Sequence, residues 1–169
     1  MKMKNVLMIL ISLAVVFAMV GVVSANGIGG QATGNTSIQY NVDESYIVTI
    51  PENVNFNAGL SGSGTVAASD VLLADGKKLT VTMTSKNGYG TSFNLTYGNP
   101  VSSIPYSITV GGTPVTTNSY VVLTVPAGTT INSVALTFAT TDEDIAKATK
   151  SGLHQDTLTF TCAVVQPTP

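Results

Sequence analysis

The segment LTVTMT, residues 79–84, alternates one apolar residue with one threonine three times over. Because successive side chains of a β-strand point to opposite faces, Leu79, Val81 and Met83 share one face and the threonines share the other. Residues 156–164 repeat the pattern, with Leu158, Phe160, Cys162 and Val164 on the apolar face and Thr157, Thr159 and Thr161 opposite. Both segments therefore predict strands with one face in a core and one in water.

Similar alternation, rich in threonine and β-branched residues, recurs along most of the chain. It predicts further strands over residues 37–42, 45–50, 64–72, 92–97, 106–110, 120–125 and 133–138, about nine in all. Turn-forming pairs such as Asp75-Gly76, Asn87-Gly88, Gly111-Gly112 and Ala127-Gly128 separate these strands. The glycine-rich residues 59–64 are interpreted as a loop, because they lack the lysine and helix start of a phosphate-binding loop.

Short strands at this spacing, without helices long enough for parallel crossovers, predict an all-β fold. We expect an antiparallel immunoglobulin-like β-sandwich of about 8–9 strands. Residues 141–152 break the alternation, with a capping threonine, early acids, late lysines and a final glycine. They predict one short helix before the last strand, with Ile145 and Ala148 facing the sheet.

The N-terminus carries the features of an export signal. Lys2 and Lys4 precede a largely apolar run over residues 6–23, which ends in Val23-Ser24-Ala25. This pattern predicts a signal peptide over residues 1–25, cleaved after Ala25, and an uncleaved membrane anchor is the alternative. We expect a flexible glycine-rich arm over residues 26–36, one sandwich domain over 37–165 and a tail over 166–169.

Removal of residues 1–25 would leave five lysines and nine acidic residues, a formal net charge of −4. With no arginine and scattered lysines, the chain lacks the basic surface that nucleic-acid binding requires. Its single cysteine, Cys162, permits no intramolecular disulfide. We therefore expect a secreted or cell-surface protein that does not bind nucleic acid and that contacts a membrane only through an uncleaved leader.

His154 is the only histidine and Cys162 the only thiol, so together they could form a base and a nucleophile. Cys162 lies on the predicted inward face of a strand, where it is better interpreted as a small buried core residue. A hydrolase using His154 with Asp156 is the remote alternative, because no oxyanion donors accompany them. No nucleophile elbow, Walker loop or metalloprotease motif occurs, so we expect no catalytic residues and no cofactor.

Three other groups of residues are candidate sites. Asp142, Glu143 and Asp144 offer clustered oxygens to a metal, but they lack the spacing of a calcium loop and suit a helix start better. Tyr89, within Lys86-Asn87-Gly88-Tyr89-Gly90, is the one tyrosine predicted to be displayed on a loop, and could bind a ligand. Asn35 and Asn94 each begin an N-glycosylation tripeptide.

The segment Gly152-Leu153-His154-Gln155-Asp156-Thr157-Leu158-Thr159-Phe160-Thr161 resembles the closing strand of spore-coat-protein-U and pilin-like secreted β-sandwiches. Leu153 and His154 depart from that pattern where tyrosine is usual. The resemblance implies an immunoglobulin-like domain in a surface layer, appendage or adhesive coat. Some such proteins polymerise by giving a terminal strand to a neighbour. The resemblance implies no catalytic or binding residue.

These observations lead to three hypotheses. The first is an exported, non-enzymatic structural or adhesive protein, in which residues 37–42 add as a strand to another subunit's open sheet edge. Pairing of residues 37–42 within their own domain is the alternative. The second is a monomeric binding module for a glycan or protein, using Tyr89 and turns such as residues 86–91 and 111–117. The third is the hydrolase.

Overall fold

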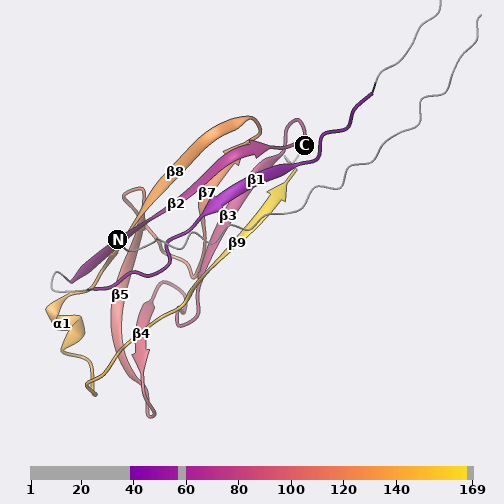
Figure 1. The fold of residues 1–169 in the computed structure, drawn as a ribbon. Coiled ribbons are helices and arrows are strands. Elements are labelled where there is room, and N and C mark those ends of the chain that lie inside the picture. Colours follow the sequence, from indigo (N-terminus) through magenta and orange to yellow (C-terminus); the bar gives the residue numbers. More distant parts are fainter. Residues whose placement is uncertain (1–38, 57–59, 167–169) are drawn as a thin grey trace, which may run out of the picture. The chain divides into compact units, whose positions relative to one another are not determined.

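The structure is a computed structural model that describes residues 39–56 and 60–166. Its described residues form nine strands and one helix (Figure 1). The elements are β1 (Ser45–Thr49), β2 (Ser61–Leu72), β3 (Lys78–Ser85), β4 (Phe93–Tyr97), β5 (Ser102–Val110), β6 (Thr113–Pro114), β7 (Ser119–Pro126), β8 (Thr129–Ala139), α1 (Asp142–Ile145) and β9 (Leu158–Val165). The predicted all-β fold with a short helix before the last strand is confirmed.

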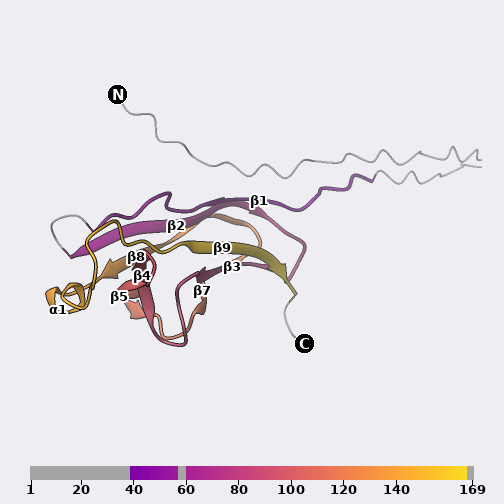
Figure 2. The same cartoon turned by 90° about the horizontal axis from the view of Figure 1, so that it is seen from below.

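All strand pairs are antiparallel and form two sheets. One sheet has the order β1-β2-β8-β5-β4, with β6 paired to β5, and the other has the order β7-β3-β9. Figure 2 shows β3, β7 and β9 beneath the layer that contains β1 and β2. The two sheets therefore enclose one core between them.

The core confirms the predicted faces of the two clearest strands. Leu79, Val81 and Met83 of β3 are buried, and they pack in one cluster with residues such as Ile108 and Phe138 of the other sheet. The inward residues of β9 join this cluster but are only half-buried: Leu158, Phe160, Cys162 and Val164. The difference arises because β3 lies between two strands, whereas β9 is at the edge of its sheet.

The start of β2 corrects the predicted loop over residues 59–64. Ser61–Gly64 belong to the strand, and Gly62 and Gly64 face the interior without a side chain. A Cβ atom on Gly64 would lie 2.8 Å from Cβ of Pro51, and one on Gly62 would collide with Val54. The segment after β1 thus supplies the apolar side chains that this part of β2 lacks.

The helix is shorter than the sequence pattern predicts. Thr141 caps α1 as expected, with its Oγ1 accepting a hydrogen bond from the backbone N–H of Asp144 at 3.1 Å. The α-helix ends at Ile145, and tighter turns follow at Lys147 and Ala148. Ile145 is 40% exposed and Ala148 is half-buried, so the predicted inner face of the helix is covered only in part.

The predicted strand over residues 37–42 is not found in its described part. Residues 39–42 adopt no regular structure, and they belong to a different compact unit from the nine strands. Tyr40 and Val42 are 77% and 60% exposed. The predicted leader and arm over residues 1–36 lie outside the described residues. No helix in the described ranges is both long and apolar enough to span a membrane.

Candidate functional site: a cleft beside the last strand

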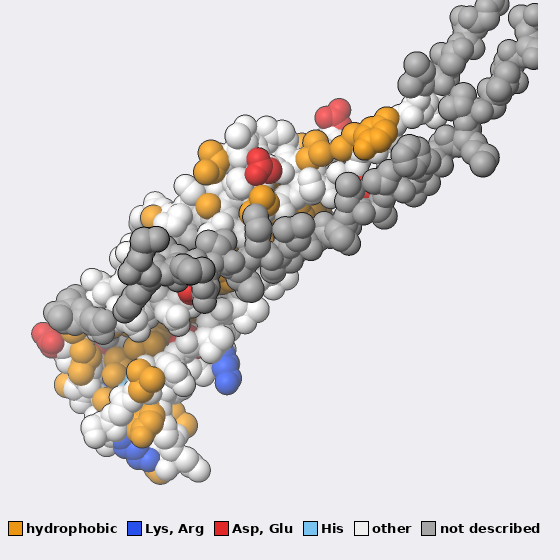
Figure 3. All heavy atoms as spheres, in the orientation of Figure 1, with side chains coloured by type: hydrophobic (Ala, Val, Ile, Leu, Met, Phe, Trp, Pro, Cys, Tyr) orange, Lys and Arg blue, Asp and Glu red, His pale blue; other side chains and the backbone are white. Residues whose placement is uncertain are grey.

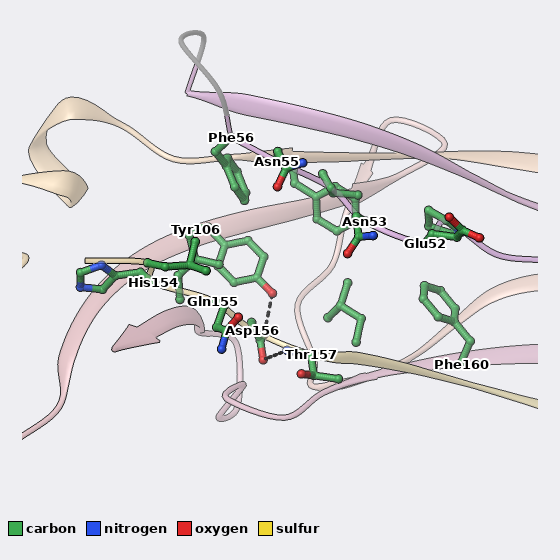
Figure 4. Close-up of a pocket in the computed structure, with 16 residues that line it drawn as sticks. Glu52, Asn53, Asn55, Phe56, Tyr106, His154, Gln155, Asp156, Thr157 and Phe160 are labelled. Atoms are coloured by element: carbon green, nitrogen blue, oxygen red, sulfur yellow. Dashed lines mark hydrogen bonds between the residues drawn. The ribbon is translucent and has the colours of Figure 1, made fainter. Parts of the chain in front are cut away.

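A cavity of about 460 Å³ opens between the segment that follows β1 and the segment that leads into β9. Residues 51–56 form one wall, and residues 153–158 with Phe160 form the other. Leu95, Tyr106 and Phe138 complete the lining. Figure 4 shows Phe56 and Asn55 on one wall and Gln155 and Thr157 on the other. The cavity therefore lies between segments that are about a hundred residues apart in the chain.

The first wall is positioned by packing rather than by strand pairing. Pro51 and Val54 fill the space above Gly64 and Gly62 of β2. Phe56 packs edge-on against Tyr106, with ring centroids 5.9 Å apart and an interplanar angle of 69°. Such edge-to-face pairs contribute about 0.5–1.5 kcal/mol beyond area burial. These contacts hold the segment against the core while leaving the side that faces β9 open.

The second wall continues into a sheet edge. Within residues 39–56 and 60–166, β9 pairs only with β3. The backbone N–H of Lys86 donates to the carbonyl of Thr157 at 2.9 Å, which continues the β3–β9 register by one pair. Because hydrogen-bonded and non-hydrogen-bonded pairs alternate in an antiparallel ladder, the even-numbered residues of β9 direct their backbone N–H and C=O groups to the outer edge. These residues are Leu158, Phe160, Cys162 and Val164.

Strands β1 and β9 also carry a strip of half-buried apolar side chains. Tyr46 and Val48 of β1 and Cys162 and Val164 of β9 all pack against the core without being fully covered. Burial raises the pKa of Tyr46, and the nearby Cys162 thiol adds to the effect. We call the cavity together with these four side chains the β1–β9 cleft. The four side chains add an apolar strip beside the mixed polar and apolar lining of the cavity and the backbone edge of β9.

Cys162 departs from the sequence interpretation. It faces inward as predicted, but it is half-buried in the β1–β9 cleft instead of enclosed in the core. Burial raises the pKa of its thiol, which lowers the fraction of reactive thiolate at neutral pH.

A polar cluster around Asp156 fixes the segment that leads into β9. The carboxylate accepts hydrogen bonds from Ser85 Oγ at 2.5 Å, Tyr106 Oη at 2.7 Å, and the backbone N–H groups of Asn87 and Thr157 at 3.0 and 2.7 Å. The bond from Tyr106 is dashed in Figure 4. Burial, and then the bond to Asp156, raise the pKa of Tyr106 well above its usual range. Four donors on one carboxylate join three separate parts of the fold.

A second cluster is centred on Ser102, which is 1% exposed. Its Oγ accepts the backbone N–H groups of Thr149 and Lys150 at 3.0 and 3.2 Å, and lies 2.8 Å from Nε2 of His154. Nδ1 of His154 lies 3.1 Å from the carbonyl oxygen of Gly152. A hydroxyl that accepts two N–H groups directs its own proton to the remaining partner, here His154 Nε2. These partners assign the imidazole proton to Nδ1, which donates to Gly152.

The Ser102–His154 pair superficially has the composition of a nucleophile and its base. The Ser102 oxygen is buried, however, and already accepts two backbone hydrogen bonds, so it has no free lone pair or path toward a substrate. His154 and Asp156, which the hydrolase hypothesis combines, bind different partners in the structure. The geometry of both clusters suits the anchoring of a loop.

The other candidate residues are dispersed. Tyr89 is 89% exposed at a tight turn, where its backbone bonds to that of Ser92. Asn94 lies on β4, and its side chain accepts a hydrogen bond from Ser103 Oγ at 3.1 Å. Asn35 lies outside the described residues.

The acidic run begins α1. Asp144 bonds to Thr141 and forms an ion pair with Lys147, which together lower the pKa of its carboxyl group. Asp142 and Glu143 complete the first turn. In the part of the chain that the structure describes, no group of three or more histidine, cysteine or acidic side chains could hold a metal ion.

In comparisons with known proteins, no family model, no curated protein and no solved structure matches the chain.

Proposed function

We propose that the protein is an exported, non-enzymatic structural or adhesive subunit of a cell surface, and that copies associate by strand addition in the β1–β9 cleft. The observation that carries this proposal is that, among residues 39–56 and 60–166, β9 pairs on one side only and lies beside a preformed cavity lined by both polar and apolar residues. Added strands bind such edges through main-chain hydrogen bonds, and side-chain pockets determine which sequence fits. The predicted export signal and the few charged residues, 9% of the chain, agree with a packed extracellular coat.

The added strand that we propose is the segment Ser37–Val42 of a second copy. In this sequence Ile38, Tyr40 and Val42 alternate with polar residues, so a strand would place three apolar side chains on one face. Tyr40 and Val42 are exposed in the structure, although both are large and apolar. A segment with an uncovered apolar face thus complements a cleft with a partly covered apolar strip.

The charges present little obstacle to such a contact. Residues 37–42 contain no charged side chain. Of the acids that line the cavity, Asp156 is already bound by four donors, which leaves Glu52. On the face shown in Figure 3, charged side chains are few and well separated. Burial of the apolar strip, at about 25 cal/mol per Å² of apolar surface, should therefore add to the main-chain hydrogen bonds along β9.

The test uses Val164, whose backbone N–H is directed to the open edge. Val164→Pro removes that donor while leaving the bonds between β9 and β3 in place, and Val164→Ala is a matched control that shortens the side chain but keeps the donor. We expect the mature chain and Val164→Ala to form fibres or large assemblies in negative-stain microscopy and Val164→Pro to remain monomeric. Equal assembly of all three proteins would rule out this edge.

The source of the added strand is tested separately. A chain lacking residues 26–42 should keep its thermal transition, because the nine strands begin at Ser45, and should not assemble. A synthetic peptide of residues 37–42 should bind it and should bind the Val164→Pro variant more weakly. If the truncated chain still assembles, another segment is the added strand. If the peptide binds but full chains stay monomeric, residues 37–42 occupy the cleft of their own chain.

A second function is favoured by one observation, the display of Tyr89. Its side chain is almost fully exposed between Gly88 and Gly90, as is common for aromatic residues that contact ligands. A monomeric binding module for a glycan or protein would use this turn. Glycan-array binding that is lost in Tyr89→Ala, with no assembly of the parent chain, would favour it over the structural role.

A further inference from the structure

The wall of the cleft that precedes β9 is held by few groups. Backbone hydrogen bonds join Gln155 to Thr96 of β4 at 3.0 and 3.1 Å, and Asp156, the next residue toward β9, binds its four donors. Toward α1, the part containing Thr149 and Lys150 is tied to Ser102. His154 joins these parts, because it bonds Ser102 and also lines the cavity.

The Ser102 cluster is complete only when His154 is neutral. The Ser102 oxygen accepts two N–H groups and its proton goes to the unprotonated Nε2 of His154. A second proton on the imidazole would make Nε2 a donor. Two hydrogens would then meet between Nε2 and the Ser102 oxygen, whose lone pairs are already in use. At least one of the bonds to Thr149, Lys150 or His154 must break.

Among the described residues, no acidic side chain is hydrogen-bonded to Nε2 of His154 and could accept its proton in place of Ser102. The charged residues that share its loop or its cavity are Lys150, Asp156 and, across the cavity, Glu52; the acids of α1, Asp142, Glu143 and Asp144, lie earlier in the chain. Within the described residues, none of the acids is hydrogen-bonded to the ring. Asp156 is bound by its four donors, and Asp144 is paired with Lys147.

Tyr97 flanks the imidazole ring on the side of β4. From β4, Tyr97 packs against His154 with ring centroids 5.6 Å apart, and Ser102 of β5 carries no charge. An imidazolium freed from Ser102 would gain contact with water and could keep its contact with the Tyr97 ring, and both environments favour a cation. Neutral and charged His154 thus prefer different positions.

We propose that His154 is a pH-sensitive latch that helps to hold Thr149, Lys150 and its own loop on Ser102 of β5 at neutral pH and that loosens this attachment on mild acidification. Histidine is the side chain whose charge changes most readily on mild acidification. Release loosens one wall of the β1–β9 cleft at Leu153 and His154, while the Asp156 cluster keeps β9 in its sheet. The latch does not depend on strand addition.

Nuclear magnetic resonance can follow the latch directly, because His154 is the only histidine in the chain. Its imidazole signals give the titration, and hydrogen exchange reports on the backbone N–H groups of Thr149 and Lys150. As the imidazole takes up its proton, we expect the protection factors of these two groups to fall by about tenfold, the loss of one hydrogen bond. The N–H groups of Asn87 and Thr157, bound to Asp156, should keep theirs.

Two variants keep the test specific. His154→Gln can still accept the Ser102 proton but does not titrate, so protection of Thr149 and Lys150 should become equal at pH 8 and pH 5.5. Ser102→Ala should lower their protection at both pH values. Unchanged protection of Thr149 and Lys150 in the parent chain across the imidazole titration would overturn the latch, as would a pH dependence that persists in His154→Gln.

Discussion

At the residue scale, Asp156 is the side chain beside the cleft whose carboxylate accepts four hydrogen bonds. Replacing it with Asn keeps the shape but offers one acceptor oxygen and sets an N–H₂ group against the donors. We expect Asp156→Asn to lower the free energy of unfolding by about 2–3 kcal/mol, because hydrogen bonds to a charged, partly buried group are lost. Urea denaturation measures this.

Tyr106→Phe provides the matched comparison for that measurement. It removes a single donor from the carboxylate and leaves three, so the expected loss is about 1 kcal/mol. A loss in Asp156→Asn no larger than that in Tyr106→Phe would show that the carboxylate is not the centre of the cluster.

Tyr106 also predicts how stability changes in alkali. Its pKa is raised in the folded protein by burial and by the bond to Asp156, whereas an unfolded tyrosine ionises near pH 10. Its contribution to stability is therefore complete below about pH 10 and is lost as the pH rises above that value. Denaturation between pH 8 and pH 11 should show a steeper loss for the parent chain than for Tyr106→Phe. Tyr46, whose pKa is also raised, gives both proteins a shared residual slope.

At the element scale, β2 and the segment after β1 depend on each other through glycine. Gly64→Ala would place a Cβ atom 2.8 Å from Cβ of Pro51, so the wall of the cleft must shift. We expect destabilisation of about 1–3 kcal/mol, as for overpacked cores. Ser63→Ala, on the outward face of the same strand, should change stability by less than about 0.5 kcal/mol. Thermal melts of the two variants compare them, and equal midpoints would refute the packing argument.

Most strands could be predicted from the sequence. Alternation predicted eight of the nine described strands, because within one strand the residues that face the core are apolar and those that face water are polar, as β3 shows most clearly. The start of β2 was missed, since its glycines have meaning only beside Pro51 and Val54, which lie elsewhere in the chain. The helix was overestimated because Ser102, a distant residue without any local signal, takes the N–H groups of Thr149 and Lys150.

In the candidate sites, too, features set by local sequence could be predicted and features set by strand order could not. Tyr89, predicted from its glycine neighbours, is displayed as expected. The β1–β9 cleft and both polar clusters could not be predicted, because they depend on strand order, and no single segment of sequence specifies that β9 is an edge strand. Cys162 illustrates the gap: alternation gave its inward direction, and only the sheet order explains why it is half-buried.

At the scale of the whole molecule, one sheet has more strands than the other, and the apolar side chains of β1 and β9 that meet the core are only partly covered by the rest of the described residues. The only thiol, Cys162, lies on this opening and so reports on its occupancy. Because burial raises its pKa, we expect it to react with a disulfide reagent more slowly at pH 7 than in the urea-unfolded chain. A peptide of residues 37–42 should slow the reaction of the native chain by at least about tenfold and leave the unfolded chain unaffected. A scrambled peptide of the same composition is the control, and equal rates with both peptides would mean that residues 37–42 do not cover Cys162.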